Sequence, residues 1–175
     1  RTRGEQRLRH GLRLLLKRQC QRVLFYVLLA HLGAMSLTWS MVSLLLYPLL
    51  SRPQGVVVGR AAVSSVCRGF WACATWLGLM RIDDTALNAL SRDDGLIIAA
   101  NHPSMLDAML VIARVPRGIC IMRANLMRNP FLGGSARLAR YIRNDPPRRM
   151  IRSCVANLKQ GGQLVLFPEG TRTVT

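Results

Sequence analysis

Acidic residues are scarce in this sequence. It has 8 Asp and Glu against 25 Lys and Arg, which gives a formal net charge of +17 over 175 residues. So large an excess of positive charge predicts an anionic partner, and nucleic acid and anionic lipid are the two main classes. The length is enough for one domain of ordinary size with an appendage, and 50% of the residues are hydrophobic, so a core can form.

Two familiar cysteine and serine patterns are also missing. The sequence has five cysteines but no C-x-x-C pair and no cluster of Cys with His. This excludes the usual ligand spacing of a zinc site, and the odd number fits reduced, mostly buried thiols in a protein that faces the cytosol. A G-x-S-x-G sequence is absent as well, which excludes the serine nucleophile elbow of the α/β-hydrolases.

Charged residues are absent from residues 23–50. A helix that spans a bilayer needs about 20 such residues, and this stretch is too long for the core of a signal peptide. Residues 1–22 carry eight Lys and Arg against one Glu, with leucines at helical spacing. We expect residues 1–22 to be a basic amphipathic arm on anionic headgroups, with a solvated tail as the alternative. Residues 23–52 are then a membrane-embedded helical segment.

The sequence leaves two routes for the chain through the membrane. Residues 23–50 dip into the bilayer and return with a break near Gly33, or residues 61–80 supply a second membrane element. Phe70, Trp71 and Trp76 are typical of a helix at the membrane interface, so residues 53–80 are expected to form an interfacial helix or linker. In-plane or hairpin insertion is favoured over a single crossing, which would separate the basic arm from the rest of the chain.

From residue 81 the pattern changes to short strands alternating with helices. It predicts an α/β domain over residues 81–175, with a mixed, mostly parallel sheet flanked by helices. Asp145 is expected to cap a helix that has Pro146 at its first position. The strands are expected at residues 95–100, 118–124 and 163–167, the first helix at 104–113, and the apolar face of the later helix at Met150, Ile151, Cys154, Val155 and Leu158.

The first candidate site follows the strand at 95–100, where the chain reads Asn101-His102-Pro103-Ser104 and Asp107 comes five residues after the histidine. Two residues five apart on a regular helix point in different directions, so they cannot pair there. Pro103 disfavours helix at His102 and starts one after it, which lets the Asp107 carboxylate reach back to the imidazole. Alternatively, Ser104 and Asp107 form a capping box and His102 is a surface turn residue.

The second candidate site is Phe-Pro-Glu-Gly-Thr-Arg at residues 167–172, just after the strand at 163–167. It reads as a simple turn with a solvated Glu169 and Arg172. However, ligands of α/β sheets usually bind beyond the carboxyl ends of the strands, and Arg172 is able to hold a phosphate in bidentate fashion.

Together, N-H-x-x-x-x-D and F-P-E-G-T-R about 65 residues later resemble the glycerolipid acyltransferases, the lysophosphatidate acyltransferase group. The resemblance covers residues 75–175. The family's second block, a Gly, an apolar run and an Arg, is matched only loosely, by residues 139–144 with Arg143. Its fourth block lies beyond the third, so the resemblance implies a domain that is incomplete at residue 175.

The resemblance implies acyl transfer from a thioester to the hydroxyl of a lysophospholipid. His102 is then the general base, Asp107 orients it, and Ser104 caps the helix. The expected acceptor-binding residues are Ser104, Arg143, Glu169, Gly170, Thr171 and Arg172.

No cofactor or metal is implied, because the donor, acyl-CoA or acyl-carrier protein, is a co-substrate. The expected partners are membrane lipids, the lysophospholipid and the donor, without nucleic acid. The donors are cytosolic, so the domain is expected on the cytoplasmic face of the inner membrane. The competing interpretations are a non-enzymatic, membrane-anchored basic protein that binds anionic lipid or nucleic acid, and the same fold acting on a different lipid acceptor.

Overall fold

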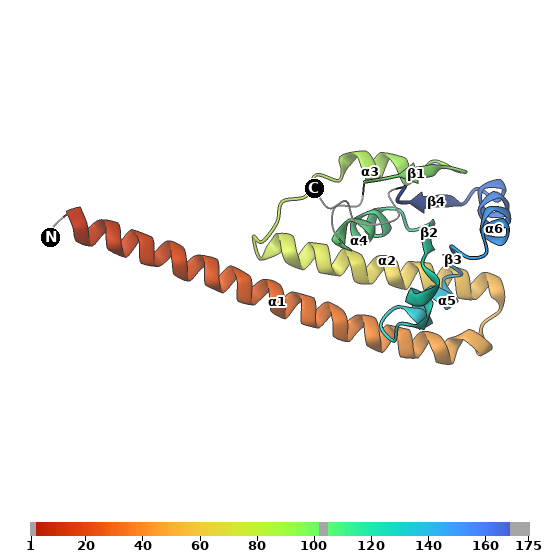
Figure 1. Ribbon diagram of the computed structural model, residues 1–175, viewed down its shortest axis with the longest axis horizontal. Coiled ribbons are helices and arrows are strands. Elements are labelled where there is room, and N and C mark those ends of the chain that lie inside the picture. Colours follow the sequence, from red (N-terminus) through yellow and green to blue (C-terminus); the bar gives the residue numbers. More distant parts are fainter. Residues whose placement is uncertain (1–2, 102–104, 169–175) are drawn as a thin grey trace.

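The computed structural model describes residues 3–101 and 105–168. Two long helices form an antiparallel hairpin, and a small α/β domain packs along it (Figure 1). The hairpin consists of α1 (Arg3–Leu49) and α2 (Arg52–Trp76). The domain contains, in chain order, α3 (Thr85–Leu90), β1 (Ile97–Ala99), α4 (Met105–Arg114), β2 (Gly118–Met122), the 3-10 helix η1 (Ala124–Arg128), α5 (Gly133–Leu138), β3 (Ile142–Arg143), α6 (Pro147–Lys159) and β4 (Gln163–Leu166).

The turn of the hairpin is fixed by local chemistry. The backbone N–H and the hydroxyl of Ser51 both donate to Oε1 of Gln54, at 3.2 and 2.7 Å. This satisfies a free donor at the helix start, and Pro53 suits the first turn because it needs no N–H there. Of the two routes left open for the membrane segment, the one with a break near Gly33 is wrong, since α1 continues through that residue. One glycine costs a helix only about 1 kcal/mol relative to alanine, which its neighbours outweigh.

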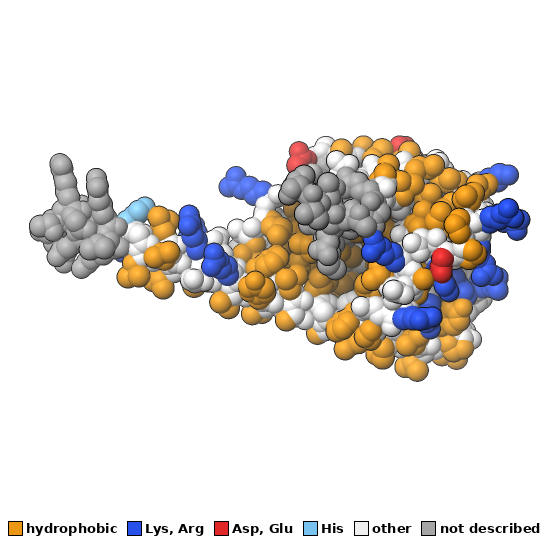
Figure 2. Space-filling view, viewed as in Figure 1, with side chains coloured by type: hydrophobic (Ala, Val, Ile, Leu, Met, Phe, Trp, Pro, Cys, Tyr) orange, Lys and Arg blue, Asp and Glu red, His pale blue; other side chains and the backbone are white. Residues whose placement is uncertain are grey.

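By length and composition alone, α1 from His10 to Leu49 and α2 are each long and apolar enough to cross a membrane. Only 11% of the most apolar window of α1 is buried within the protein, unlike the core helix of a soluble domain. Hydrophobic side chains follow α1 along much of its length (Figure 2), and Leu12, Leu15 and Tyr26 are more than half exposed. These helices indicate membrane association.

The packing of α2 corrects one expectation. Phe70 and Trp71 are 4% and 6% exposed and do not face outward as interfacial side chains. They form a core with Ala74 of the same helix and Ala113 of α4. Only Trp76, 84% exposed at the end of α2, keeps the exposure of an interfacial anchor. The helix therefore supports the domain with its buried face.

The short helix α5 joins both hairpin helices to the domain through close backbone contacts. The N–H of Gly134 donates to the Ser40 hydroxyl of α1 at 3.0 Å, and a Cβ on Gly134 would lie 2.1 Å from the Ser40 carbonyl oxygen. On the other side, a Cβ on Gly59 of α2 would lie 2.7 Å from the Ala139 nitrogen. Only glycine permits such short backbone distances, so these two contacts determine how the hairpin packs against the domain.

The sheet has four strands in the order β1-β4-β2-β3, and every pairing among the described residues is parallel. This confirms the predicted α/β class, with each expected strand shorter than its apolar run. The missed strand is β3, because two residues are too few to give an alternation pattern.

Each strand alternates between the two faces of the sheet. Ile98, Cys120 and Val165 pack on one face with Val111 of α4, and the opposite face packs on α6 through Cys154. Cys154, Met150 and Leu158 of the predicted α6 face contact that core, whereas Ile151 and Val155 are 57% and 45% exposed, contrary to expectation. The sheet is too narrow to cover the whole apolar side of α6.

The start of α6 also differs from expectation. Its N-cap is Pro146 and its first residue is Pro147, so Asp145 is not the cap. The Asp145 carboxylate instead accepts two hydrogen bonds from the guanidinium of Arg143, each 3.2 Å long. The pair joins opposite charges through two parallel hydrogen bonds, so the carboxylate is engaged by Arg143 and does not cap the helix.

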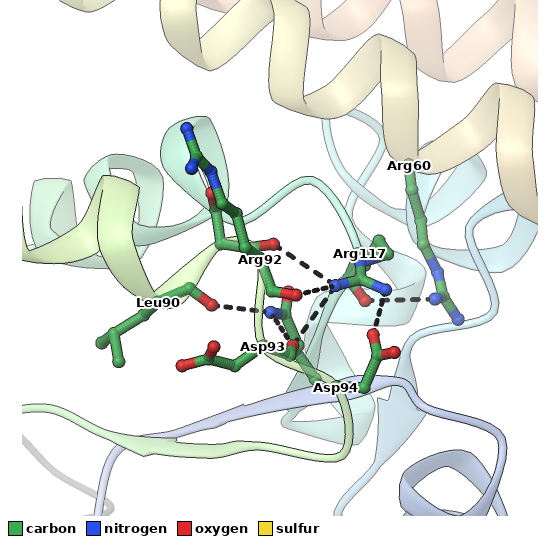
Figure 3. A network of polar contacts seen from close by, with 8 residues as sticks. Arg60, Leu90, Arg92, Asp93, Asp94 and Arg117 are labelled. Atoms are coloured by element: carbon green, nitrogen blue, oxygen red, sulfur yellow. Dashed lines mark hydrogen bonds and ion pairs between the residues drawn. The ribbon is translucent and has the colours of Figure 1, made fainter.

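The amino-terminal end of the sheet is held by a network of polar contacts (Figure 3). The guanidinium of Arg117 pairs with Asp94 and also donates to the carbonyls of Ser91, Arg92 and Asp93. From α2, Arg60 donates to the Arg117 carbonyl at 3.2 Å. The buried amide of Gln163 donates to the carbonyls of Leu90 and Asp93 at 2.9 and 2.7 Å. This network fixes the loop that leads into β1.

Candidate active site

The two sequence motifs follow strands that are direct neighbours. In the β1–β4 pair, Ala99 lies opposite Leu166, and the N–H of Ala100 donates to the Leu166 carbonyl at 3.2 Å. Because the strands are parallel, the chain leaves both of them at the same edge of the sheet. The segments that begin at Asn101 and Phe167 therefore start about one strand spacing apart, roughly 5 Å. Two motif segments that are far apart in the sequence therefore start side by side.

Asp107 lies in the first turn of α4, the helix that follows β1. Its side chain is partly buried and has a partner. An acidic side chain there is favoured by the amino end of the helix.

Most of the other predicted site residues lie outside the described part of the chain. These are His102, Ser104, Glu169, Gly170, Thr171 and Arg172.

Arg143 is among the described residues. It is the last residue of β3, the outer strand on the side of the sheet away from β1. Its guanidinium is bound to Asp145, and both side chains are about half exposed. Since β3 is two strand positions from β4, Arg143 lies roughly 10 Å from the end of β4. Arg143 therefore lies at the carboxyl end of the strands, the same end of the sheet at which the second motif begins.

A cavity of about 360 Å³ opens beside Arg143. Its walls come from α1, η1, α5 and the turn before β3, and they combine arginines with tyrosines and small apolar side chains. The lining residues are Tyr47, Ala124, Met127, Arg128, Ala136, Arg137, Arg140, Tyr141 and Arg143. Burial raises the pKa of Tyr141 well above its usual value, so this phenol stays neutral.

Within the described residues, no group of three His, Cys, Asp or Glu side chains comes together in a way that could hold a metal ion. The buried thiol of Cys120 lies in β2, next to Val165 of β4, and burial raises its pKa to about 12. It stays protonated at neutral pH and is not a thiolate nucleophile.

Comparison with known proteins adds the family. The sequence model of the family described as Acyltransferase matches residues 81–175, more than half of the chain. The chain belongs to this family. The match begins where the α/β pattern begins, and it includes both motifs.

One relative gives the family more detail. The 1-acyl-sn-glycerol-3-phosphate acyltransferase of Helicobacter pylori is 30% identical over 107 residues, which are 58% of this chain and 45% of that protein. This chain thus spans less than half of the length of the relative that it matches. No solved structure matches the chain. The resemblance to glycerolipid acyltransferases that the motifs predicted is confirmed.

The sequence did not predict the arginine-lined cavity beside Arg143. Tyr47, Arg128 and Arg137 belong to no motif, Arg140 lies in the loosely matched second block, and Tyr47 is far from the arginines in the sequence. One signal was available, since residues 115–144 hold six arginines and no acidic residue. A charge excess in one segment does not show which of its side chains converge.

Proposed function

We propose that this chain is the membrane-bound part of an acyltransferase that moves a fatty acyl group from acyl-CoA or acyl-carrier protein to the hydroxyl of a lysophosphatidate-like acceptor. The observation that carries the proposal is the adjacency of Ala100 and Leu166, which starts the two motif segments side by side in a member of the Acyltransferase family. A pair of motifs that acts on one substrate needs such a common edge.

His102 is the general base of the proposed reaction. A lipid hydroxyl is a poor nucleophile until its proton is removed, and a neutral imidazole takes that proton as the oxygen attacks the thioester carbon. The C–O bond forms as the C–S bond breaks, and the proton on the imidazolium passes to the leaving thiolate. Asp107 keeps the imidazole in the right tautomer and stabilises its charged form, as the acid of a triad does.

The acceptor's phosphate is assigned to the second motif. Arg172 binds it with Gly170 and Thr171, and Arg143 adds a positive charge from the side. Glu169 repels a phosphate, so its role is to position an arginine or the acceptor hydroxyl. The support for Arg143 is its place at the carboxyl end of β3, at the same edge of the sheet.

The membrane hairpin supplies access to the acceptor. A lysophospholipid keeps its acyl chain in the bilayer, so the domain must lie at the surface, and the exposed leucines of α1 support this. The donors are cytosolic and anionic, which assigns the domain to the cytoplasmic face of the membrane and gives a use to the +17 charge.

The deciding experiment is thiol release in detergent micelles from acyl-CoA and from acyl-carrier protein, with lysophosphatidate as acceptor. We expect turnover by the wild type and a loss of at least about 10²-fold in His102→Ala, the contribution of a general base. The matched control is His31→Ala, an exposed histidine on α1.

Equal turnover in His102→Ala and the wild type would remove the base assignment. If the wild type releases thiol only with another lipid acceptor, the fold is right and the acceptor is wrong. A wild type that is inactive with every acceptor, yet binds anionic vesicles or nucleic acid, is the non-enzymatic protein instead.

A further inference from the structure

The cavity between α1, η1 and α5 has an unusual balance of charge. Four of its lining side chains are arginines, and none of the described lining residues is acidic. Four guanidinium groups around about 360 Å³ repel one another, and the repulsion is relieved when an anion enters. All four arginines are exposed, so solvent screens part of the repulsion, and Arg143 is paired with Asp145, which leaves the excess charge on the other three.

Two of the arginines are held in place by the protein. The Arg140 guanidinium donates to the Tyr47 hydroxyl at 2.7 Å and lies 4.6 Å from the centre of the Tyr47 ring. Its backbone has φ 57°, in the left-handed region that a residue other than glycine rarely occupies. Arg143 is held by Asp145. These contacts fix the positions of both groups before any ligand binds, which lowers the entropy cost of binding.

The other two arginines have no protein acceptor. Arg128 ends η1 and Arg137 lies in the last turn of α5, and neither side chain makes an ion pair or hydrogen bond with residues 3–101 or 105–168. The contrast with Arg117, which has four acceptors, shows that this fold can satisfy an arginine where it has a structural role.

We propose that this arginine pocket is a phosphate-binding site, built jointly by the domain and by Tyr47 of the membrane hairpin. Guanidinium groups bind phosphate oxygens in pairs, and several of them match a group with two negative charges better than a carboxylate. The site lies beside β3, whereas the motif segments follow β1 and β4. Arg143 is also assigned to the acceptor's phosphate in the proposed function, whereas Arg128, Arg137 and Arg140 are not, and the inference goes beyond that function because phosphate binding here does not require acyl transfer.

A lipid headgroup and a soluble phosphate ester share this chemistry. Leu45 and Leu49, next to Tyr47 along α1, are 71% and 77% exposed and are able to lie against acyl chains. The two sources are separated by two probes for the whole chain in uncharged micelles or bilayers. One is adenosine 3′,5′-bisphosphate in solution, and the other is a phosphatidylcholine vesicle with phosphatidate, compared with phosphatidylcholine alone.

The test variant is Arg128→Gln with Arg137→Gln. Its control is Arg148→Gln with Arg149→Gln, which removes the same charge from exposed positions at the start of α6, away from the pocket. We expect the pocket variant to bind at least one probe at least tenfold more weakly, since two charge-assisted hydrogen-bond donors are lost. The control should change by less than about twofold, as expected for screened surface charge. Circular dichroism melting curves of both variants verify that they fold.

Loss confined to the vesicle probe supports the site with a lipid headgroup as its source, and loss confined to the bisphosphate supports it with a soluble ligand. Equal losses in the pocket and control variants overturn the proposal, because binding then follows net charge. Absence of wild-type binding to both probes overturns it as well. This experiment measures binding and not acyl transfer, so its outcome does not depend on whether the proposed reaction is correct.

Discussion

The two halves of the sheet end in different chemistry. The β1–β4 half leads into the segments with the histidine and carboxylate motifs, whereas the β2–β3 half leads into η1, Arg143 and the arginine pocket. The first half carries groups that exchange protons, and the second carries groups that stay charged at any physiological pH. The proposed reaction centre and the anion site thereby lie on one sheet, and of the side chains named for them Arg143 is common to both, so the halves are separable by mutation at the other positions.

The largest expected effect separates the halves directly. Replacing His102 by Ala should lower kcat by about 10² to 10⁴ and leave the phosphate affinity of the arginine pocket within twofold of the wild type. Thiol-release kinetics and bisphosphate binding on the same preparation measure both. A parallel loss of phosphate binding would mean that the halves form one site.

A smaller effect is expected at Asp107. Asp107→Asn keeps the size of the side chain but removes the charge that stabilises the imidazolium, so kcat should fall by roughly 10- to 100-fold. Asp93→Asn is the control, because Asp93 is exposed and enters the polar network through its carbonyl. If Asp107→Asn keeps full activity, the carboxylate caps α4 and has no part in the reaction.

The dependence on pH should differ between the halves. In the proposed mechanism the active form of His102 is neutral, so kcat/KM should fall as the pH is lowered and the imidazole takes up a proton. Guanidinium groups stay protonated throughout, so any decrease in phosphate binding over this range comes from protonation of the phosphate, whose second pKa is about 6, and should be the same in the His102→Ala variant. Rates and binding measured between pH 5 and 8 test this. A rate that is flat over this range contradicts a histidine base.

The smallest effect concerns the opposite end of the sheet. Gln163→Leu removes two hydrogen bonds from a side chain that is 0% exposed, so it should lower the free energy of unfolding by about 1–3 kcal/mol. Gln160→Leu, at an exposed position, should stay within about 0.5 kcal/mol. Thermal unfolding in micelles reports both values. Equal melting temperatures would show that the network of Figure 3 does not hold the loop before β1.

Local signals predicted part of the fold well. The apolar runs at residues 95–100 and 163–167 contain β1 and β4, because burial on both faces of a parallel strand leaves a continuous apolar segment. The run before Arg114 forms α4. Local signals failed where partners compete. Asp145 binds Arg143 instead of capping α6, and Trp71 is buried against α4 instead of facing a membrane. In each case a partner outside the helix, Arg143 of β3 or a residue of α4, outweighs the preference of the helix itself.

The sequence by itself determined the chemistry of the first half of the sheet. The spacing of His102 and Asp107 and the residues 167–172 point to the Acyltransferase family, and the uncharged stretch 23–50 points to a membrane. Only the tertiary structure decided that the two motif segments begin on neighbouring strands, and that Tyr47 meets Arg140 across 93 residues. The physical reason is that residue types and short spacings carry local chemistry, whereas convergence depends on strand order and on the glycine contacts that seat the hairpin.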